Sequence, residues 1–367
     1  MLHSGVLGAM SRTVGSDFGR KKGNGFARAS WALGPTEFGF ISDWLGIFRA
    51  LTLTGSAKAR FDCLDSNLKR RLHTKCSVLA RVEATTVPML ASKFGWLAGD
   101  ILEAACRIDA NAFRLEDGSS RAVFGLASMI NHDCAPNARV EMVDGGRRMR
   151  LLARRRIDLG QEVTITYCSP LMGTGGRRQS LLKSKLFLCS CGRCQDPTER
   201  GSHMGSVRCT KCPRGLMTPE AGHYVCNTCS FQCGHEKVDG VIETAIKNQS
   251  KILTSGQVLT LSTVKKLLYE QRLPPTAACV LDFKINVVNC PWTENTPDMW
   301  KTKLLFLKER IAVLDLVDPG DSRLLAFLHL KLHQLCLKVG DEESRSQMRA
   351  SREIVKRIQG DNFGTVQ

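Results

Sequence analysis

Two groups of cysteines and one tyrosine carry the chemistry that this sequence can perform. Two Cys-x2-Cys pairs, Cys209 with Cys212 and Cys226 with Cys229, are separated by thirteen residues. Each pair presents two sulfurs on one side of a tight turn, so two pairs together close a tetrahedral shell of four thiolates around zinc. This spacing predicts a structural zinc site, with disulfides or free thiols as the alternative.

A second cysteine group supplies three sulfurs from one stretch: Cys189, Cys191 and Cys194. A four-coordinate zinc needs one more ligand from elsewhere in the chain. Cys134 is the predicted fourth ligand, and Cys168 is the alternative. With Cys134 as ligand, the metal would hold the chain that follows Tyr167 against the turn formed by residues 131–134, and its binding free energy would add to that of folding. We therefore expect two zinc ions per chain.

The stretch from Gly125 to Cys194 combines this cysteine group with a tyrosine that the pattern places in the core. Tyr167 ends the apolar segment VTITY, and Asn131 and His132 form a polar turn upstream. Taken singly, each of these could be an ordinary core or turn residue. Their order and spacing relative to the cysteines indicate an active site.

The composition is that of a soluble protein with a basic surface. The 367 residues include 52 Lys and Arg against 35 Asp and Glu, which gives a formal net charge of +17. That charge suits anionic partners, but a solvated basic face is the favoured explanation. The 16 cysteines would suggest disulfides in a secreted chain, yet the first residues lack a secretory-signal pattern, which favours reduced thiols and metal. No apolar run reaches the roughly 18 residues of a membrane span, so we expect no membrane partner and residence in the nucleus, the cytoplasm or both.

Hydrophobic periodicity divides the chain into regions of different type. Residues 1 to about 50 show little periodicity, and a helical pattern begins near Asp62, with Asp65 and Asn67 as candidate caps. A helix is predicted over residues 96–108, with Leu97 on its apolar face. Strands with glycine turns are predicted over three segments: 138–143, 147–153 and 163–167.

Beyond residue 235 the apolar spacing is helical throughout. Five helices are predicted there: Val238–Leu253, Ser262–Gln271, Ala277–Val288, Met299–Leu316 and Asp321–Leu337. Asp321 is the expected N-cap of the last one. The predicted class is therefore α+β, with a β-strand core, a helical insert, a cysteine-rich zinc-binding module and a C-terminal all-α domain of helical hairpins.

Three motifs in order carry a resemblance to a known family. They are NHDCAPN from Asn131, GQEVTITY from Gly160, and RRQSLLKSKLFLCSCGRCQDPTE from Arg177 to Glu199. They resemble the SET-domain protein-lysine methyltransferases, in particular the SET and MYND subfamily, whose post-SET segment reads F-x-C-x-C-x-R-C-x-D-P-T-E. The resemblance covers about residues 95 to 340, where the second cysteine group and the helical tail with VDPGDSRL look like the arthropod branch. It implies a SET-type strand core and a post-SET zinc module.

The resemblance also implies a role for each matching residue. Tyr167 would be the catalytic tyrosine, and Cys134 would be the zinc ligand shared with the post-SET cysteines. Five residues would bind S-adenosylmethionine, the last by packing on its adenine: Asn131, His132, Ser128, Asn111 and Phe187. The segment with Tyr167 would thread close to the NHDC turn.

Two features of the family do not match. The MYND finger, with its seven cysteines and one histidine, is missing, because only Cys63, Cys76 and Cys106 precede Asn111. The glycine loop that binds the cofactor has one candidate, Gly23–Gly25, and the segment after it lacks a strand pattern. We therefore expect a degenerate N-terminal lobe or an incomplete gene product.

The expected organisation has five parts: an irregular or incomplete N-terminal lobe (1–60), a helical insert (61–110), the SET core (111–188), the post-SET zinc module (189–235) and the C-terminal helical domain (236–367). The implied activity is methyl transfer from S-adenosylmethionine to a lysine of a protein, a histone tail among the candidates. The alternative is a catalytically silent SET scaffold that binds protein partners through its helical domain, for example in transcriptional regulation. Direct nucleic-acid binding is the weakest of the three, because the zinc module lacks the base-reading helices of zinc fingers.

Overall fold

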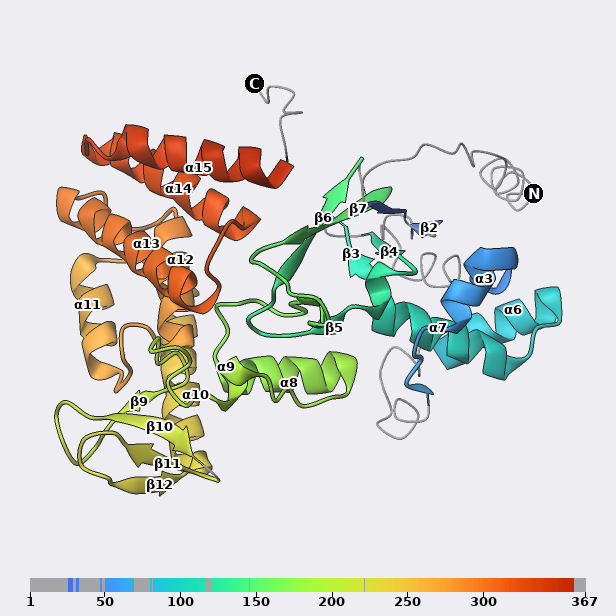
Figure 1. Ribbon diagram of the computed structural model, residues 1–367. Coiled ribbons are helices and arrows are strands. Elements are labelled where there is room, and N and C mark those ends of the chain that lie inside the picture. Colours follow the sequence, from blue (N-terminus) through green and yellow to red (C-terminus); the bar gives the residue numbers. More distant parts are fainter. Residues whose placement is uncertain are drawn as a thin grey trace.

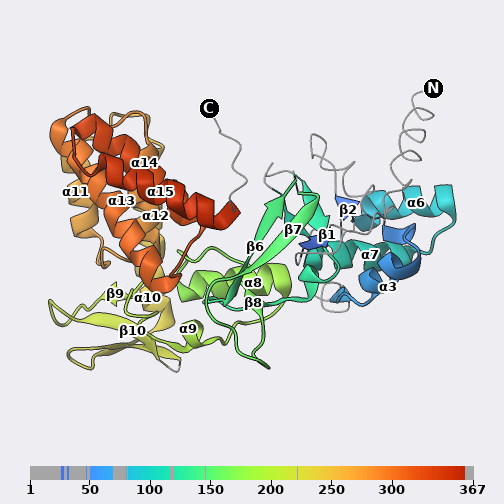
Figure 2. The ribbon, with the colours of Figure 1, turned by 45° about the horizontal axis from the view of Figure 1, so that its top comes forward.

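The computed structural model describes residues 26–28, 31–32, 47, 50–68, 80, 82–115, 120–144, 146–220 and 222–359. The candidate loop Gly23–Gly25 and most of the helical segment expected after Asn67 lie outside these residues. Both views of the ribbon show the same order along the molecule. Helices from residues 55–111 lie at one end, short strands (green) lie in the middle, and the C-terminal helices (orange to red) lie at the other end (Figure 1 and Figure 2).

The helices at the N-terminal end pack around one apolar cluster. They are α3 (Gly55–Asp62), the π-helix η1 (Val82–Thr86), α6 (Val87–Phe94) and α7 (Ala98–Asn111). Helix α7 buries Ile101 and Ile108 in this cluster, as the helical spacing predicted. Leu97, which the pattern places on the same face, is 71% exposed because it stands before the first turn as the N-cap.

Short strands form the centre of the molecule. Their bounds are β1 (Phe26–Arg28), β2 (Trp31–Ala32), β3 (Phe113–Arg114), β4 (Arg121–Val123), β5 (Asn131–His132), β6 (Ala138–Val143), β7 (Arg148–Ala153) and β8 (Thr164–Ile165), with the 3-10 turn η2 (Ala127–Met129) before β5. Two antiparallel sheets have the orders β1-β7-β6 and β2-β4-β3, and β5 pairs with β8 in parallel. Buried side chains of Phe124 and Met149 belong to one apolar cluster between these strands.

The hairpin of β6 and β7 confirms the predicted glycine turn. Asp144 and Gly146 have positive φ values of 54° and 83°. A Cβ atom on Gly146 would lie 2.8 Å from a methyl carbon of Leu115, which would have to shift, and the positive φ of Gly146 itself disfavours any larger residue. Strands β1 and β2 were not predicted, because strands of two or three residues are too short to show an alternating pattern.

Helix α8 (Thr174–Lys185) and the short α9 (Gly192–Gln195) connect the strands to a cysteine-rich sheet (Figure 1). This sheet consists of β9 (Val207–Arg208), β10 (Leu216–Glu220), β11 (His223–Cys226) and β12 (Gln232–Gly234), in the antiparallel order β12-β11-β10-β9. Met217 and Tyr224 of the sheet share an apolar cluster with Val238 and Ala245 of the helix that follows. The small sheet is thereby anchored to the helical region.

The C-terminal region is helical, and it completes the predicted α+β class. Its helices are α10 (His235–Leu253), α11 (Leu261–Glu270), α12 (Ala278–Asn289), α13 (Pro297–Val317), α14 (Arg323–Val339) and α15 (Ser344–Gln359). The first five begin and end within three residues of the predicted bounds, whereas α15 was not predicted. Leu307, Leu314, Leu328 and Leu332 lie in the core of this region. Within the described ranges, no helix is long and apolar enough to span a membrane.

An arginine joins the helical region to the strand core. The Arg154 guanidinium, after the end of β7, forms an ion pair with the carboxylate of Asp318 in the loop between α13 and α14. It also donates to the backbone oxygens of Asp318 and Pro319, at 3.1 and 2.9 Å. The charged groups of both ion-pair partners are buried, so this contact fixes the loop against the strands.

The N-cap of α14 differs from the prediction. The cap is Ser322, whose hydroxyl accepts a hydrogen bond from the Leu325 N–H at 3.0 Å. Asp321, the predicted cap, lies one residue too early, and its carboxylate pairs instead with Arg357 of α15 at 2.6 Å. Both residues are good caps in isolation, so the sequence alone could not decide between them.

Candidate functional site

The parallel pair of β5 and β8 brings the NHDC turn beside Tyr167. Asn131 lies opposite Thr164, and His132 lies opposite Ile165. The Tyr167 N–H donates to His132 Nδ1 at 2.9 Å, and the centroids of the two rings are 5.2 Å apart. Two segments more than thirty residues apart in the chain therefore meet at one tyrosine, as the motifs indicated.

The side chain of Tyr167 is not buried as the sequence predicted. It is 36% exposed, because β8 ends at Ile165 and the tyrosine follows in a bend. Its hydroxyl donates a hydrogen bond to the backbone oxygen of Ile130. Partial burial, together with the negative charge of Glu162, raises the pKa of Tyr167 above its ordinary value. The tyrosine is therefore a neutral phenol at physiological pH, with its oxygen beside a carbonyl oxygen.

Lys185 covers one face of this tyrosine. It is the last residue of α8, and its Nζ lies 5.3 Å from the centroid of the Tyr167 ring. The same ammonium donates to the backbone oxygen of Ala110. A cation over the face of an aromatic ring is an attractive arrangement. The amine thus links the tyrosine to the end of α7.

The residues that the resemblance assigns to the cofactor lie in two hydrogen-bonded groups. Ser128 Oγ donates to the backbone oxygen of Asn111 at 3.0 Å. Asn111 Nδ2 in turn donates to the backbone oxygens of Asp65 and Arg107, at 2.9 and 2.8 Å. These bonds fix the side chain of Asn111 at the end of α7.

The second group surrounds His132. The ring centroid of Phe187 lies 6.0 Å from that of His132. Asn131 Nδ2 donates to Glu162 Oε1 at 2.7 Å, and its side chain is exposed. An aromatic ring for stacking and amide groups for hydrogen bonds are the chemistry that an adenosine-containing cofactor requires.

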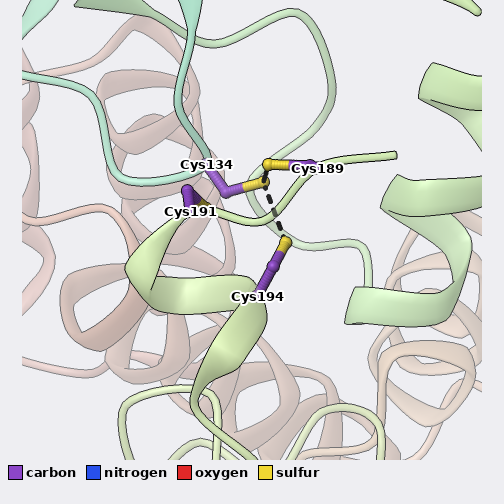
Figure 3. A group of neighbouring side chains, drawn as sticks. All are labelled: Cys134, Cys189, Cys191 and Cys194. Carbon is purple, nitrogen blue, oxygen red and sulfur yellow. Dashed lines mark hydrogen bonds between the residues drawn. The ribbon is translucent and has the colours of Figure 1, made fainter. Parts of the chain in front are cut away.

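Four cysteine sulfurs meet behind the NHDC turn, as Figure 3 shows. Cys134, Cys189, Cys191 and Cys194 place all their Sγ atoms within 4.8 Å of one another. Cys134 Sγ lies 3.9 Å from that of Cys189 and 3.5 Å from that of Cys194. With Zn–S bonds of about 2.3 Å, a regular tetrahedron has sulfurs about 3.8 Å apart, so this group fits a zinc ion.

Cys168, the alternative fourth ligand, lies close by in a different group. Its Sγ is within 4.8 Å of Cys134 Sγ and of a ring nitrogen of His132. His132 Nε2 itself lies 3.2 Å from Cys134 Sγ. The four-cysteine group of Cys134 thus forms without Cys168, which lies beside the histidine instead.

The second cysteine group also converges. Cys209, Cys212, Cys226 and Cys229 lie within the same 4.8 Å limit, and two of their S–S distances are 3.7 and 3.6 Å. Backbone N–H groups of the two turns point at Cys209 and Cys226, at 3.2 and 3.4 Å. The second group therefore fits zinc as closely as the first.

Sequence reasoning missed three charged residues beside the Cys134 group. Arg177, Arg193 and Glu199 are at most 2% exposed, and both arginines contact the Glu199 carboxylate. Burial acts to lower the pKa of Arg177, but Glu199 outweighs it and the pKa stays above its ordinary value. Burial and the nearby Arg177 lower the pKa of Arg193. Charged residues are mostly exposed, so the spacing gave no sign of burial; membership of the third motif was the only signal.

A family model described as "SET domain" matches residues 39–168, which include strands β3 to β8 and end directly after Tyr167. Residues 39–168 of the chain are therefore a SET domain. The chain is 29% identical, over 236 residues, to the SET domain-containing protein SmydA-8, isoform B, of Drosophila melanogaster, a match that covers 60% of this chain and 52% of that protein. The chain also matches two histone-lysine N-methyltransferases over shorter stretches.

The first of these is SET5 of Saccharomyces cerevisiae (strain YJM789), 46% identical over 74 residues, which are 20% of this chain and 14% of that protein. The second is SMYD3 of Homo sapiens, 34% identical over 102 residues, which are 27% of this chain and 23% of that protein. The SET domain is thus similar to those of the SET and MYND type, as the motifs indicated. The chain spans about half the length of SmydA-8 and less than a quarter of the other two relatives.

Proposed function

We propose that this protein is an S-adenosylmethionine-dependent protein-lysine N-methyltransferase with two structural zinc ions. The family and its relatives support a methyltransferase of the SET type. The observation that carries the proposal within the structure is the meeting of two oxygens, the Tyr167 hydroxyl and the Ile130 carbonyl, beside His132.

The proposed chemistry is an in-line displacement. S-adenosylmethionine, when bound, supplies a methyl group on a sulfonium. The methyl and the lysine amine would be oriented by the Tyr167 hydroxyl and the Ile130 carbonyl, which lie within hydrogen-bond distance of each other. Most of the rate would come from this alignment, because holding reactants in a near-attack geometry removes much of the entropic barrier. The lysine amine must be neutral, and desolvation near a positive charge lowers its pKa toward that state.

The proposed cofactor site consists of Asn131, His132, Ser128, Asn111 and Phe187. Phe187 would stack on the adenine, while the two asparagines and Ser128 would hold the polar groups. The fit rests on an exposed amide at Asn131 and an aromatic ring next to His132.

The proposed zinc ions would be structural. Each cysteine group offers four sulfurs, which fills a tetrahedral shell and leaves no open position for a reacting water. The ion at Cys134 would fix the NHDC turn to the segment after α8, and the ion at Cys209 would hold the two turns of the small sheet together.

The proposed substrate is a protein that carries a lysine. Two relatives are named histone-lysine N-methyltransferases, which makes a histone tail one candidate. We propose residence in the nucleus, the cytoplasm or both, where such substrates occur, and protein partners at the C-terminal helices.

The test is a comparison of wild-type protein with Tyr167→Phe. The full chain is incubated with radiolabelled S-adenosylmethionine and a mixture of histones and lysine peptides. We expect methyl transfer in the wild type and a loss of at least about a hundredfold in the variant, because the hydroxyl that orients the methyl is gone. Zinc content is the control and should not change. Equal activity of the two proteins would refute the role of Tyr167.

A catalytically silent SET scaffold is the second candidate, and one observation favours it. Lys185 already lies over the Tyr167 ring, where its ammonium would repel a substrate lysine that arrives protonated. A scaffold of this kind would retain both zinc ions and bind protein partners but transfer no methyl group to any lysine substrate. Lys185→Met should then leave the protein inactive, whereas an enzyme inhibited by this lysine would gain activity.

A further inference from the structure

A buried arginine faces two sulfurs of the Cys134 group. Arg177 lies in the first turn of α8, and its side chain is 0% exposed. Its Nε lies 3.2 Å from Cys134 Sγ, and its Nη2 lies 3.5 Å from Cys194 Sγ. The guanidinium therefore directs two N–H groups at sulfurs from opposite ends of the cysteine set, one in the NHDC turn and one in α9.

The other donors of Arg177 are also used. Nη1 donates to the Met172 backbone oxygen at 2.5 Å and to Glu199 Oε2 at 2.6 Å, and Nη2 donates to Thr174 Oγ1 at 2.8 Å. Glu199 is held in turn by the Thr174 N–H at 2.8 Å and by Arg193 Nη2 at 3.2 Å. The guanidinium thus has one fixed orientation, set by a carboxylate that is itself fixed.

This arrangement addresses an electrostatic problem of the metal site. Four thiolates carry more negative charge than one Zn²⁺ neutralises. Charge that is buried without compensation is costly, and three of the four cysteines here are buried. A guanidinium that donates to the sulfurs places positive charge where the excess negative charge lies, and it does so with a planar, fixed set of donors.

We propose that Arg177, oriented by Glu199, is a positioning residue of the zinc site: it aligns the Cys134 and Cys194 thiolates, offsets their charge and slows the loss of the metal. The proposal rests on the proposed zinc assignment of this group. It gives a physical role to residues that the third motif contains and the methyl-transfer chemistry does not use.

The next residue in the chain is a matched control. Arg178 contacts the same cysteine segment from the same helix, but its Nε donates to the Cys189 backbone oxygen at 3.0 Å and its Nη2 to the Cys194 backbone oxygen at 3.1 Å. Neither contact reaches a sulfur. A comparison of Arg177 with Arg178 therefore separates an effect on the thiolates from general support of the loop.

The experiment follows zinc release from the full chain to a chromogenic chelator. Wild-type protein should release two equivalents, and the Cys209 group is the internal reference. We expect Arg177→Met to release one equivalent about tenfold to a hundredfold faster, the range seen when hydrogen bonds to metal ligands are removed. The release rate of the other equivalent should change less than about threefold. The same limit should hold for the release rates of both equivalents from Arg178→Met.

Arg177→Lys and cobalt substitution provide a second readout. Lysine keeps the charge but cannot reach two sulfurs and a carboxylate together. We expect Arg177→Lys to release one of its two zinc equivalents faster than the wild type. In the cobalt-substituted protein, we expect the thiolate-to-Co²⁺ charge-transfer band to shift, because the hydrogen bonds to the sulfurs are lost. If Arg177→Met unfolds and therefore releases both zinc equivalents quickly, the results for Arg177→Lys decide whether Arg177 has the proposed role.

Two failures can be told apart. Wild-type protein with fewer than two zinc equivalents would overturn the zinc assignment. Two equivalents in the wild type, with unchanged release and an unchanged cobalt band in the Arg177 variants, would overturn the role of Arg177 alone.

Discussion

At the scale of residues, His132 joins the tyrosine to the cysteine group. Its Nδ1 accepts a hydrogen bond from the Tyr167 N–H, so the proton of a neutral ring lies on Nε2. That nitrogen lies 3.2 Å from Cys134 Sγ. One imidazole thus connects the backbone of the proposed catalytic residue to a proposed zinc ligand, and loss of the metal should disturb the position of Tyr167.

The ionisation of Tyr167 gives a prediction at this scale. Its pKa is raised in the folded chain, so the folded state holds the phenolic proton more tightly than the unfolded state. The stability that results is present below the unfolded pKa of about 10 and is lost as the pH rises through the folded pKa. Tyrosine ionisation is followed as the rise in absorbance at 295 nm with pH. The part of this rise that Tyr167→Phe removes should therefore occur above pH ~10.

Tyr224 provides the comparison, because burial raises its pKa to about 12. Tyr224→Phe should remove a component that titrates near this value. A Tyr167 component that titrates below the value for free tyrosine would contradict the described environment of its hydroxyl.

At the scale of elements, the sequence predicted the helices whose apolar residues recur regularly, but not the features that depend on contacts between distant residues. The helices between residues 235 and 339 were predicted because their apolar faces recur every three or four residues. Helix α15 was missed because its sequence, SRSQMRASREIVKRIQ, is mostly polar. The two cysteine groups were predicted from spacing, whereas the burial of Arg177 and Glu199 depends on neighbours that only the fold provides.

The turn before β10 gives a prediction at this scale. A Cβ atom on Gly215 would lie 2.2 Å from Cys226 Sγ and 2.6 Å from Cys212 Sγ, closer than any real contact. Gly215→Ala should therefore disrupt the Cys209 group and lower the zinc content from two equivalents to one. Elemental analysis of purified protein measures this.

Gly240→Ala is the matched control for that substitution. Gly240 lies inside α10 with nothing within 4 Å of the added Cβ, so this variant should retain both zinc ions. It should also gain about 0.5–1 kcal/mol of stability from the better helix propensity of alanine. Two zinc equivalents in Gly215→Ala would show that the sulfurs are not arranged around a metal as described.

At the scale of the whole molecule, the buried pair of Arg154 and Asp318 connects the strand core to the C-terminal helices. Arg154→Ala leaves a carboxylate buried without its partner and should lower the unfolding free energy by about 3 kcal/mol. Arg156→Ala removes an exposed pair with Asp158 and should cost at most about 1 kcal/mol. Urea denaturation of both variants measures the difference; equal effects would show that the contact does not hold the two regions together.

The most direct test of the account is titration calorimetry of the zinc-loaded full chain with S-adenosylmethionine, because the proposed function requires the site around Asn131 and His132 to accept this cofactor. The account predicts one binding event per chain, weakened at least about tenfold in Asn131→Ala by the loss of a polar contact. The absence of measurable binding to wild-type protein that retains both zinc ions would contradict it.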